Sequence, residues 1–156
     1  MENCIWIKHS VVEYIFLNGY MWLPKETGGV LIGYRASISN FVITDIIGPG
    51  KKAIHKAASF EPDQAFHQKE IARVYRESEC LETYLGDWHT HPNSYPYLST
   101  KDKSTINIIA NHAGARLLNP LMLIAAPPHK IFKIWIYHKS DSLAKVVFRE
   151  SKIIVF

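Results

Sequence analysis

The succession of helical and extended apolar patterns along the chain constrains the fold most strongly. After Ser99, apolar side chains recur at the spacings i, i+3, i+4, i+7 and i+11, which predicts one apolar helix face. The residues on that face are Ile106, Ile109, Ala110, Ala113 and Leu117. A second helix is expected over residues 10–20, with Ser10 as its N-cap. A third is expected over residues 62–78, with Pro62 in its first turn. Its buried side would carry His67, Ile71, Val74 and Tyr75.

Short apolar runs between glycines, prolines and polar residues predict strands. They cover residues 4–8, 28–34, 41–47, 84–91, 121–126, 132–138, 143–149 and 152–156. The run at 28–34 contains three glycines, so we expect a buried strand that another segment approaches closely. Residues 51–60 are expected to form a loop. Helices alternate with strands early and strands cluster late, which predicts an α/β protein with a mixed sheet flanked by helices.

Composition and length limit the classes of protein that need to be considered. The chain has 156 residues without internal repeats or a long linker, so we expect a single domain over residues 1–156. Hydrophobic residues at 47% and charged residues at 21% exclude a disordered chain and a coiled coil. No run approaches about 18 apolar residues, and no signal peptide is recognisable, so we expect a cytoplasmic protein without a membrane partner. Cys4 and Cys80 are expected to be free thiols.

The net charge of +4, from 18 basic and 14 acidic residues, is only mildly basic. The main basic cluster, Lys51, Lys52, His55 and Lys56, has no zinc-finger or RNP-like motif beside it. We therefore interpret it as a solvated loop and do not expect a nucleic-acid partner. The histidines without a partner at ligand spacing are expected to be structural or exposed. They are His55, His67, His112, His129 and His138.

The stretch Gly-Asp-Trp-His-Thr-His-Pro carries the strongest chemical signal. In a strand, His89 and His91 would present their imidazoles on one face and Thr90 on the other. Two imidazoles form half of a zinc site, and Asp102 at the start of the next helix could supply a third ligand, leaving a fourth position for water. An isolated H-x-H is weak evidence, however, and Ser99 with Asp102 also fits a helix capping box.

Together these residues resemble a known family. His89-Thr-His91, seven further residues, Ser99, two more and Asp102 match the HxHx7SxxD motif of the JAMM metalloproteases, also called MPN+ or JAB. The segment from Glu26 to Gly33 is similar to their E-x-G-G-x-L-x-G segment. The resemblance implies the three-layer JAMM/MPN fold, which is similar to that of cytidine deaminases. It also implies one zinc ion per chain.

The chemistry of the residues and the resemblance agree on the expected roles. His89, His91 and Asp102 would hold the zinc, Glu26 would act as general base, and Ser99 would donate a hydrogen bond to the oxyanion. The sequence looks like a bacterial stand-alone JAMM domain. Its Gly-Asp-Trp-His-Thr-His-Pro stretch is similar to that of the isopeptidases of CBASS antiviral operons, which cut a ubiquitin-like linkage at the C-terminus of a nucleotidyltransferase (CD-NTase).

That resemblance implies an isopeptidase acting on a protein with an extended C-terminal tail, such as a ubiquitin-like conjugate or a CD-NTase. The tail could pair with an exposed edge at residues 28–34 or near the loop after His91. Tyr95 and Tyr97 could wall the cleft, whereas Trp88 is expected in the core. The oligomeric state is left open.

Three other functions are compatible with parts of this pattern. A zinc deaminase would need H-x-E and P-C-x-x-C motifs, and this chain has no C-x-x-C. A catalytically weak binding module for a ubiquitin-like partner would need neither Glu26 nor Ser99. A hydrolase of small peptide or amino-acid conjugates would use the same site residues and stays open.

Overall fold

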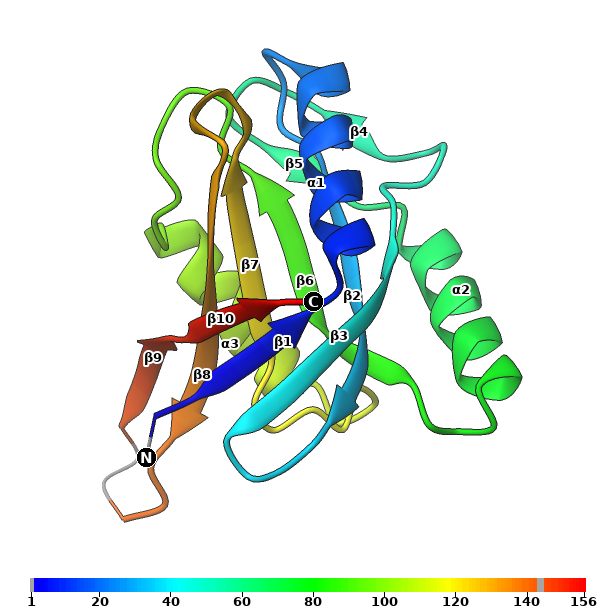
Figure 1. Ribbon diagram of the computed structural model, residues 1–156, viewed down its shortest axis with the longest axis vertical. Helices are drawn as coiled ribbons and strands as arrows, with labels where there is room; N and C mark the ends of the chain where they lie inside the picture. The colour runs from blue at the N-terminus through cyan, green and yellow to red at the C-terminus, as the bar shows by residue number, and fades with distance from the viewer. Residues whose placement is uncertain (1, 143–144) are drawn as a thin grey trace.

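The computed structural model describes residues 2–142 and 145–156, which form one large sheet, a small hairpin and helices (Figure 1). The helices are α1 (His9–Trp22), α2 (Gln64–Glu77), α3 (Thr100–Asn111) and the 3₁₀ helix η1 (Pro127–His129). The strands are β1 (Cys4–Ile7), β2 (Gly28–Arg35), β3 (Asn40–Ile47), β4 (Ile54–His55), β5 (Phe60–Glu61), β6 (Thr83–Thr90), β7 (Leu121–Ala126), β8 (Ile131–Lys139), β9 (Val146–Glu150) and β10 (Lys152–Val155). Eight strands form the large sheet in the order β10-β1-β3-β2-β6-β7-β8-β9, and β4 pairs with β5.

The large sheet is mixed and strongly curled. β1 runs parallel to both β3 and β10, and β6 runs parallel to β7, whereas the other neighbouring pairs are antiparallel. β9 and β10 are separated by Ser151 alone, yet they pair at opposite ends of the sheet (Figure 1). The Ser151 N–H donates to the Ile134 carbonyl at 2.9 Å. One short stretch of chain therefore joins the two ends of the curled sheet.

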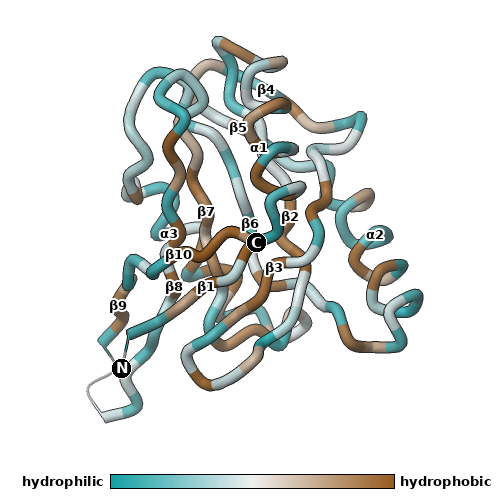
Figure 2. The backbone as a smooth tube through the Cα atoms, viewed as in Figure 1, coloured by the Kyte–Doolittle hydropathy of each residue, from teal (hydrophilic) through white to brown (hydrophobic). Residues whose placement is uncertain are grey.

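Helices cover both faces of this sheet, which confirms the predicted α/β class and gives three layers. β7 shows how the layers are divided, because successive side chains of a strand point to opposite faces. Leu121, Leu123 and Ala125 join the core cluster beneath α1. Met122 and Ile124 pack on the other face with Ile106 of α3. In Figure 2 the apolar residues follow the strands of the sheet, such as β3 and β8.

Two predicted helix starts are wrong, and a contact with another segment explains the first of them. α1 begins at His9, and its N-cap residue Lys8 makes no side-chain cap, so Ser10 is not the N-cap. The His9 N–H instead donates to the Phe156 carbonyl at 2.7 Å, so the residue after β10 satisfies the helix start. α2 begins at Gln64 after Asp63, whose carboxylate accepts the Phe66 N–H at 3.2 Å.

The buried helix faces also differ from the predicted ones. In α2, His67 and Val74 are buried and Ile71 is partly buried, but Tyr75 is exposed. α3 ends at Asn111, where His112 takes an extended conformation, so the predicted apolar face stops after Ala110. Beyond that point Ala113 is exposed and Leu117 is partly buried, both outside the helix.

The remaining elements match the prediction closely, with two qualifications. Residues 51–60 are not simply a loop, because they contain β4 and the first residue of β5. In the segment predicted as a strand at 143–149, residues 143 and 144 lie outside the described part of the chain and β9 begins at Val146. Cys4 and Cys80 are free, as predicted. Among the described residues, no helix is long and apolar enough to span a membrane.

Candidate metal centre

The end of β6 presents the two histidines on one face. A bulge at Gly86, whose φ is +149°, shifts the pairing of β6 with β2. After the bulge, Trp88 points into the core beneath α1, as predicted, and its Nε1–H donates to the Ile47 carbonyl at 3.1 Å. Thr90 also points away from the histidines and contacts Thr27. His89 and His91 therefore face the side of the sheet that carries α2 and α3.

The start of α3 brings the third residue to this place. Ser99 and Asp102 form the predicted capping box: the Asp102 N–H donates to the Ser99 hydroxyl at 3.1 Å, and the Ser99 N–H donates to Asp102 Oδ2 at 2.9 Å. The reciprocal bonds hold the Asp102 side chain at the first turn of the helix. The capping box therefore also orients Asp102, the candidate metal ligand.

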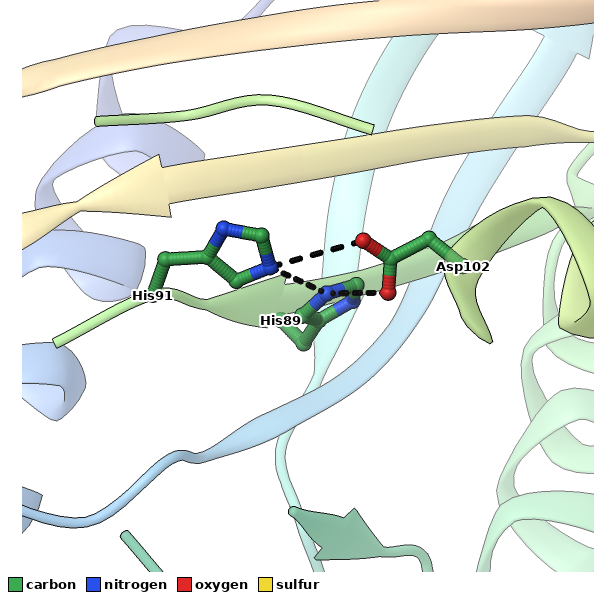
Figure 3. Close-up of side chains that lie close together, drawn as sticks. All are labelled: His89, His91 and Asp102. Atoms are coloured by element: carbon green, nitrogen blue, oxygen red, sulfur yellow. Dashed lines mark hydrogen bonds and ion pairs between the residues drawn. The ribbon is translucent and has the colours of Figure 1, made fainter. Parts of the chain in front are cut away.

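His89, His91 and Asp102 form a compact triangle of donor atoms (Figure 3). The two Nε2 atoms lie 3.3 Å apart. His89 Nε2 lies 2.9 Å from Asp102 Oδ1, and His91 Nε2 lies 3.4 Å from Asp102 Oδ2. These are the three residues that the sequence motif predicted as ligands: His89 is in β6, His91 follows the strand directly, and Asp102 is in the first turn of α3.

The triangle fits a metal ion. Four donors held tetrahedrally at about 2.0–2.1 Å from zinc lie about 3.3 Å from one another. The two Nε2 atoms here are 3.3 Å apart, and each lies 2.9 or 3.4 Å from one of the two Asp102 oxygens. Two imidazole nitrogens this close cannot both point lone pairs at each other without a proton or a cation between them. Three residues also leave a coordination position open. The arrangement is thus able to hold a metal ion.

The electrostatics of Asp102 favour a carboxylate at this site. Burial raises the pKa of Asp102, but contacts with His89 and His91 outweigh it and hold this pKa well below its usual range. The carboxyl group is therefore ionised at neutral pH, in the form that a cation requires.

Glu26 lines the same cavity from the other side. It precedes β2, and Gly28 pairs directly with His89 in the antiparallel register of β2 and β6. Burial raises the pKa of Glu26, opposed by the charges of His89, His91 and Lys101. The glycines that follow Glu26 are needed for packing: a Cβ at Gly29 would collide with the Ile47 carbonyl oxygen, as expected for a strand that is closely approached.

The cavity itself has a volume of about 680 Å³. Ser99, Lys101 and Tyr97 line it beside α3, and Phe60 of β5 lines it beside Glu26. Tyr97 stands edge-on to His91, with ring centroids 4.9 Å apart. Tyr95 instead stacks on His129, with centroids 4.2 Å apart and 15° between the planes. Of the two tyrosines predicted as cleft walls, the structure places Tyr97 in the cavity lining.

Sequence reasoning missed several residues around this cavity. His55 contacts the Glu26 backbone, and Lys101 and Asp87 line the cavity. Asp87 shares the face of His89, two positions earlier on β6, and accepts a hydrogen bond from the Tyr84 hydroxyl at 2.7 Å. The i, i+2 spacing of a strand could have identified Asp87. Nothing local in the sequence relates His55 to Glu26.

The fold and the three-donor cluster define an α/β protein with a candidate metal site. Comparisons with known proteins give its family. The model of the family described as prokaryotic homologs of the JAB domain matches residues 10–137. A relative from Sinorhizobium fredii, named "Probable metalloprotease y4qB", is 38% identical over 139 residues, covering 87% of this chain and 85% of the relative. The chain belongs to the prokaryotic JAB family and is an enzyme of the metalloprotease class.

Two further relatives carry a more specific name, "CD-NTase/cGAS isopeptidase". The one from Escherichia coli is 35% identical, covering 65% of this chain and 65% of the relative. The one from Vibrio cholerae is 32% identical, covering 70% and 71%. The solution structure of protein DSY2949 from Desulfitobacterium hafniense superposes with a TM-score of 0.69 at 18% identity, covering 97% of this chain and 92% of that one. This last similarity supports the fold.

Proposed function

We propose that this chain is a zinc-dependent isopeptidase that hydrolyses the amide bond after the extended C-terminal tail of a ubiquitin-like modifier, or of a protein conjugated in a ubiquitin-like way. The observation that carries the proposal is the convergence of the donor triangle, Glu26 and Ser99 on one cavity. The activity is assigned to a single cytoplasmic domain comprising residues 1–156.

His89, His91 and Asp102 are the proposed ligands of one zinc ion. Two imidazoles and one carboxylate suit zinc better than magnesium, which prefers oxygen ligands. Bound zinc supplies Lewis-acid chemistry, because it lowers the pKa of a water molecule to about 7. The ligand side chains are held by β6 and by the capping box of α3, so they are preorganised for the ion.

Glu26 is the proposed general base. Its carboxylate takes a proton from the attacking water and passes it to the leaving amine. Burial raises the pKa of Glu26, which brings it closer to the operating pH of a proton-transfer group. The residue lines the cavity without belonging to the donor triangle, as a base that is not a ligand should.

Ser99 is the proposed oxyanion donor. Its hydroxyl oxygen accepts the Asp102 N–H, and a hydroxyl has one proton of its own to donate. The helix cap thereby orients the oxygen while the proton serves the substrate. A donor that is already oriented needs no reorganisation during the reaction.

The place proposed for the tail depends on which strand edges are available for pairing. The predicted edge at residues 28–34 is wrong from Val30 onward, because β3 pairs with Val30–Arg35 and β6 pairs with Gly28–Gly33. The β4–β5 hairpin is a two-stranded sheet of its own, and Phe60 of β5 lines the cavity. We therefore assign the tail to the groove along this hairpin, where main-chain pairing could add a strand.

The candidate substrate is a CD-NTase conjugate, in line with the names of two relatives. The test uses a CD-NTase fused through its C-terminal tail to a reporter protein, beside short peptides of the same tail. Cleavage of the fusion at the tail, lost after chelation and restored by zinc, supports the proposal. Preferential cleavage of short peptides would indicate a small-conjugate hydrolase, and binding without cleavage would indicate a binding module. Either result would contradict the proposal.

A further inference from the structure

A ring stack stands beside Glu26, outside the donor triangle. The imidazole of His55, on β4, lies parallel to the indole of Trp22, the last residue of α1. Their ring centroids are 3.3 Å apart and their planes differ by 8°. Phe60, which pairs with His55 across the hairpin, contacts the same imidazole with centroids 5.3 Å apart. The imidazole is thus held between an α1 residue and a β5 residue.

His55 makes a directed contact with Glu26. Its Nδ1 lies 2.9 Å from the Glu26 carbonyl oxygen. A carbonyl can only accept, so Nδ1 carries the proton and donates it. The bond joins the expected base to the hairpin, and it is oriented by the plane of the stacked ring.

The other backbone group of Glu26 is held by the adjacent residue. The Glu26 N–H donates to the Lys56 carbonyl at 2.8 Å. Both backbone polar groups of Glu26 therefore bond to neighbouring residues of one hairpin, while the ladder of β2 with β6 starts only at Gly28. The backbone position of Glu26 is set by the hairpin from one side and by the sheet from the other.

We propose that His55 is a positioning residue for Glu26, and that stacking on Trp22 fixes the imidazole that bonds the Glu26 carbonyl. This inference rests on the proposed role of Glu26 as general base. His55 does not reach the reacting atoms; it acts through the backbone from which the Glu26 carboxylate extends. A displacement of about 1 Å in a reacting group can cost about 100-fold in rate, so a fixed backbone at this residue matters for kcat.

Two substitutions separate the hydrogen bond from the stack. His55→Phe keeps an aromatic ring for Trp22 and removes the donor. His55→Asn removes the ring but places an amide N–H close to the position of Nδ1. We expect His55→Phe to lower kcat by about 10- to 100-fold with KM unchanged. His55→Asn should recover only part of kcat, because it restores the donor without the stack that fixes it. His112→Phe, at an exposed site after α3, is the matched control and should leave kcat unchanged.

A double-mutant cycle tests whether His55 acts through Glu26. If it does, His55→Phe lowers kcat in the wild-type background but has no further effect on the residual rate of Glu26→Gln. Metal content and thermal unfolding are measured for each variant. If His55→Phe does not fold, His55→Ala takes its place, and we expect it to have a lower kcat than His55→Asn.

Several results would overturn the inference. The first is a kcat of His55→Phe equal to that of wild type. The second is an equal loss of kcat in His55→Phe and His55→Asn. The third is that His55→Phe lowers the rate of Glu26→Gln by the same factor as it lowers the rate of wild type. A fully active Glu26→Gln would instead refute the proposed base itself. The failure of the positioning role and the failure of the proposed function are therefore distinguishable.

Discussion

Thr27 and Thr90 join the loop that carries Glu26 to the strand that carries the two histidines. The Thr90 N–H donates to the Thr27 carbonyl at 2.9 Å, and the Thr27 N–H donates to the Thr90 hydroxyl at 3.0 Å. Both residues are fully buried. Because Thr27 follows Glu26 and Thr90 lies between His89 and His91, these bonds fix the two sides of the site relative to each other.

Replacing Thr90 by Val tests this connection. The substitution keeps the shape of the side chain but leaves the buried Thr27 N–H without its acceptor. An unsatisfied buried donor costs about 1–3 kcal/mol, so the free energy of unfolding should fall by that amount in denaturant titrations. Thr83→Val, at an exposed position on the same strand, is the control and should change stability little. Equal stability of the two variants would show that the bond is unimportant.

Ser99 is expected to have two separable roles, in the helix cap and in the reaction. Ser99→Ala should lower stability by about 1 kcal/mol, whereas Ser99→Gly should cost only a few tenths, because glycine is tolerated at an N-cap. Both variants lack the hydroxyl, so both should lose about 10²–10³ in kcat with metal still bound. Steady-state kinetics beside thermal unfolding measure the two effects. If kcat instead falls in Ser99→Ala but stays near wild type in the more stable Ser99→Gly, the proposed oxyanion role is contradicted.

Lys101 should affect the pH dependence of activity through Glu26. Its positive charge lowers the pKa of Glu26, against the rise caused by burial. Removing the charge with Lys101→Gln raises this pKa, so the active carboxylate form is lost at a higher pH on acidification. The acid limb of the kcat/KM profile should therefore move to higher pH. Lys103→Gln, which removes a lysine that faces the Phe148 ring, should leave the limb in place. If the acid limb of the kcat/KM profile lies at the same pH in Lys101→Gln as in wild type, the assignment of this limb to Glu26 is refuted.

The donor triangle was predictable from sequence because its parts are local patterns. Period-two alternation places His89 and His91 on one face, and the capping box orients Asp102. The loop between them only has to bring two ordered ends together. The start of α1 was mispredicted because the His9 N–H donates to the Phe156 carbonyl, at the far end of the chain. The start of α2 was mispredicted because Asp63, which follows Pro62, is the N-cap residue.

The surroundings of Glu26 could not be predicted in the same way. His55 lies in a basic stretch that looks like a solvated loop, and its contacts with Trp22 and Glu26 exist only once α1, β4 and the start of β2 are assembled. The edge of β2 was misjudged for a related reason. An apolar glycine-containing strand does not reveal which strands will pair with it, and here β3 and β6 take both of its sides.

Metal analysis of three purified proteins, beside cleavage of the tail fusion, tests the proposed chemistry most directly. Wild type and Glu26→Ala should each contain one zinc per chain, and His91→Ala should contain none. Cleavage should be found in wild type alone. Full zinc content in His91→Ala, or wild-type cleavage by Glu26→Ala, would contradict the assignment of the ligands or of the base.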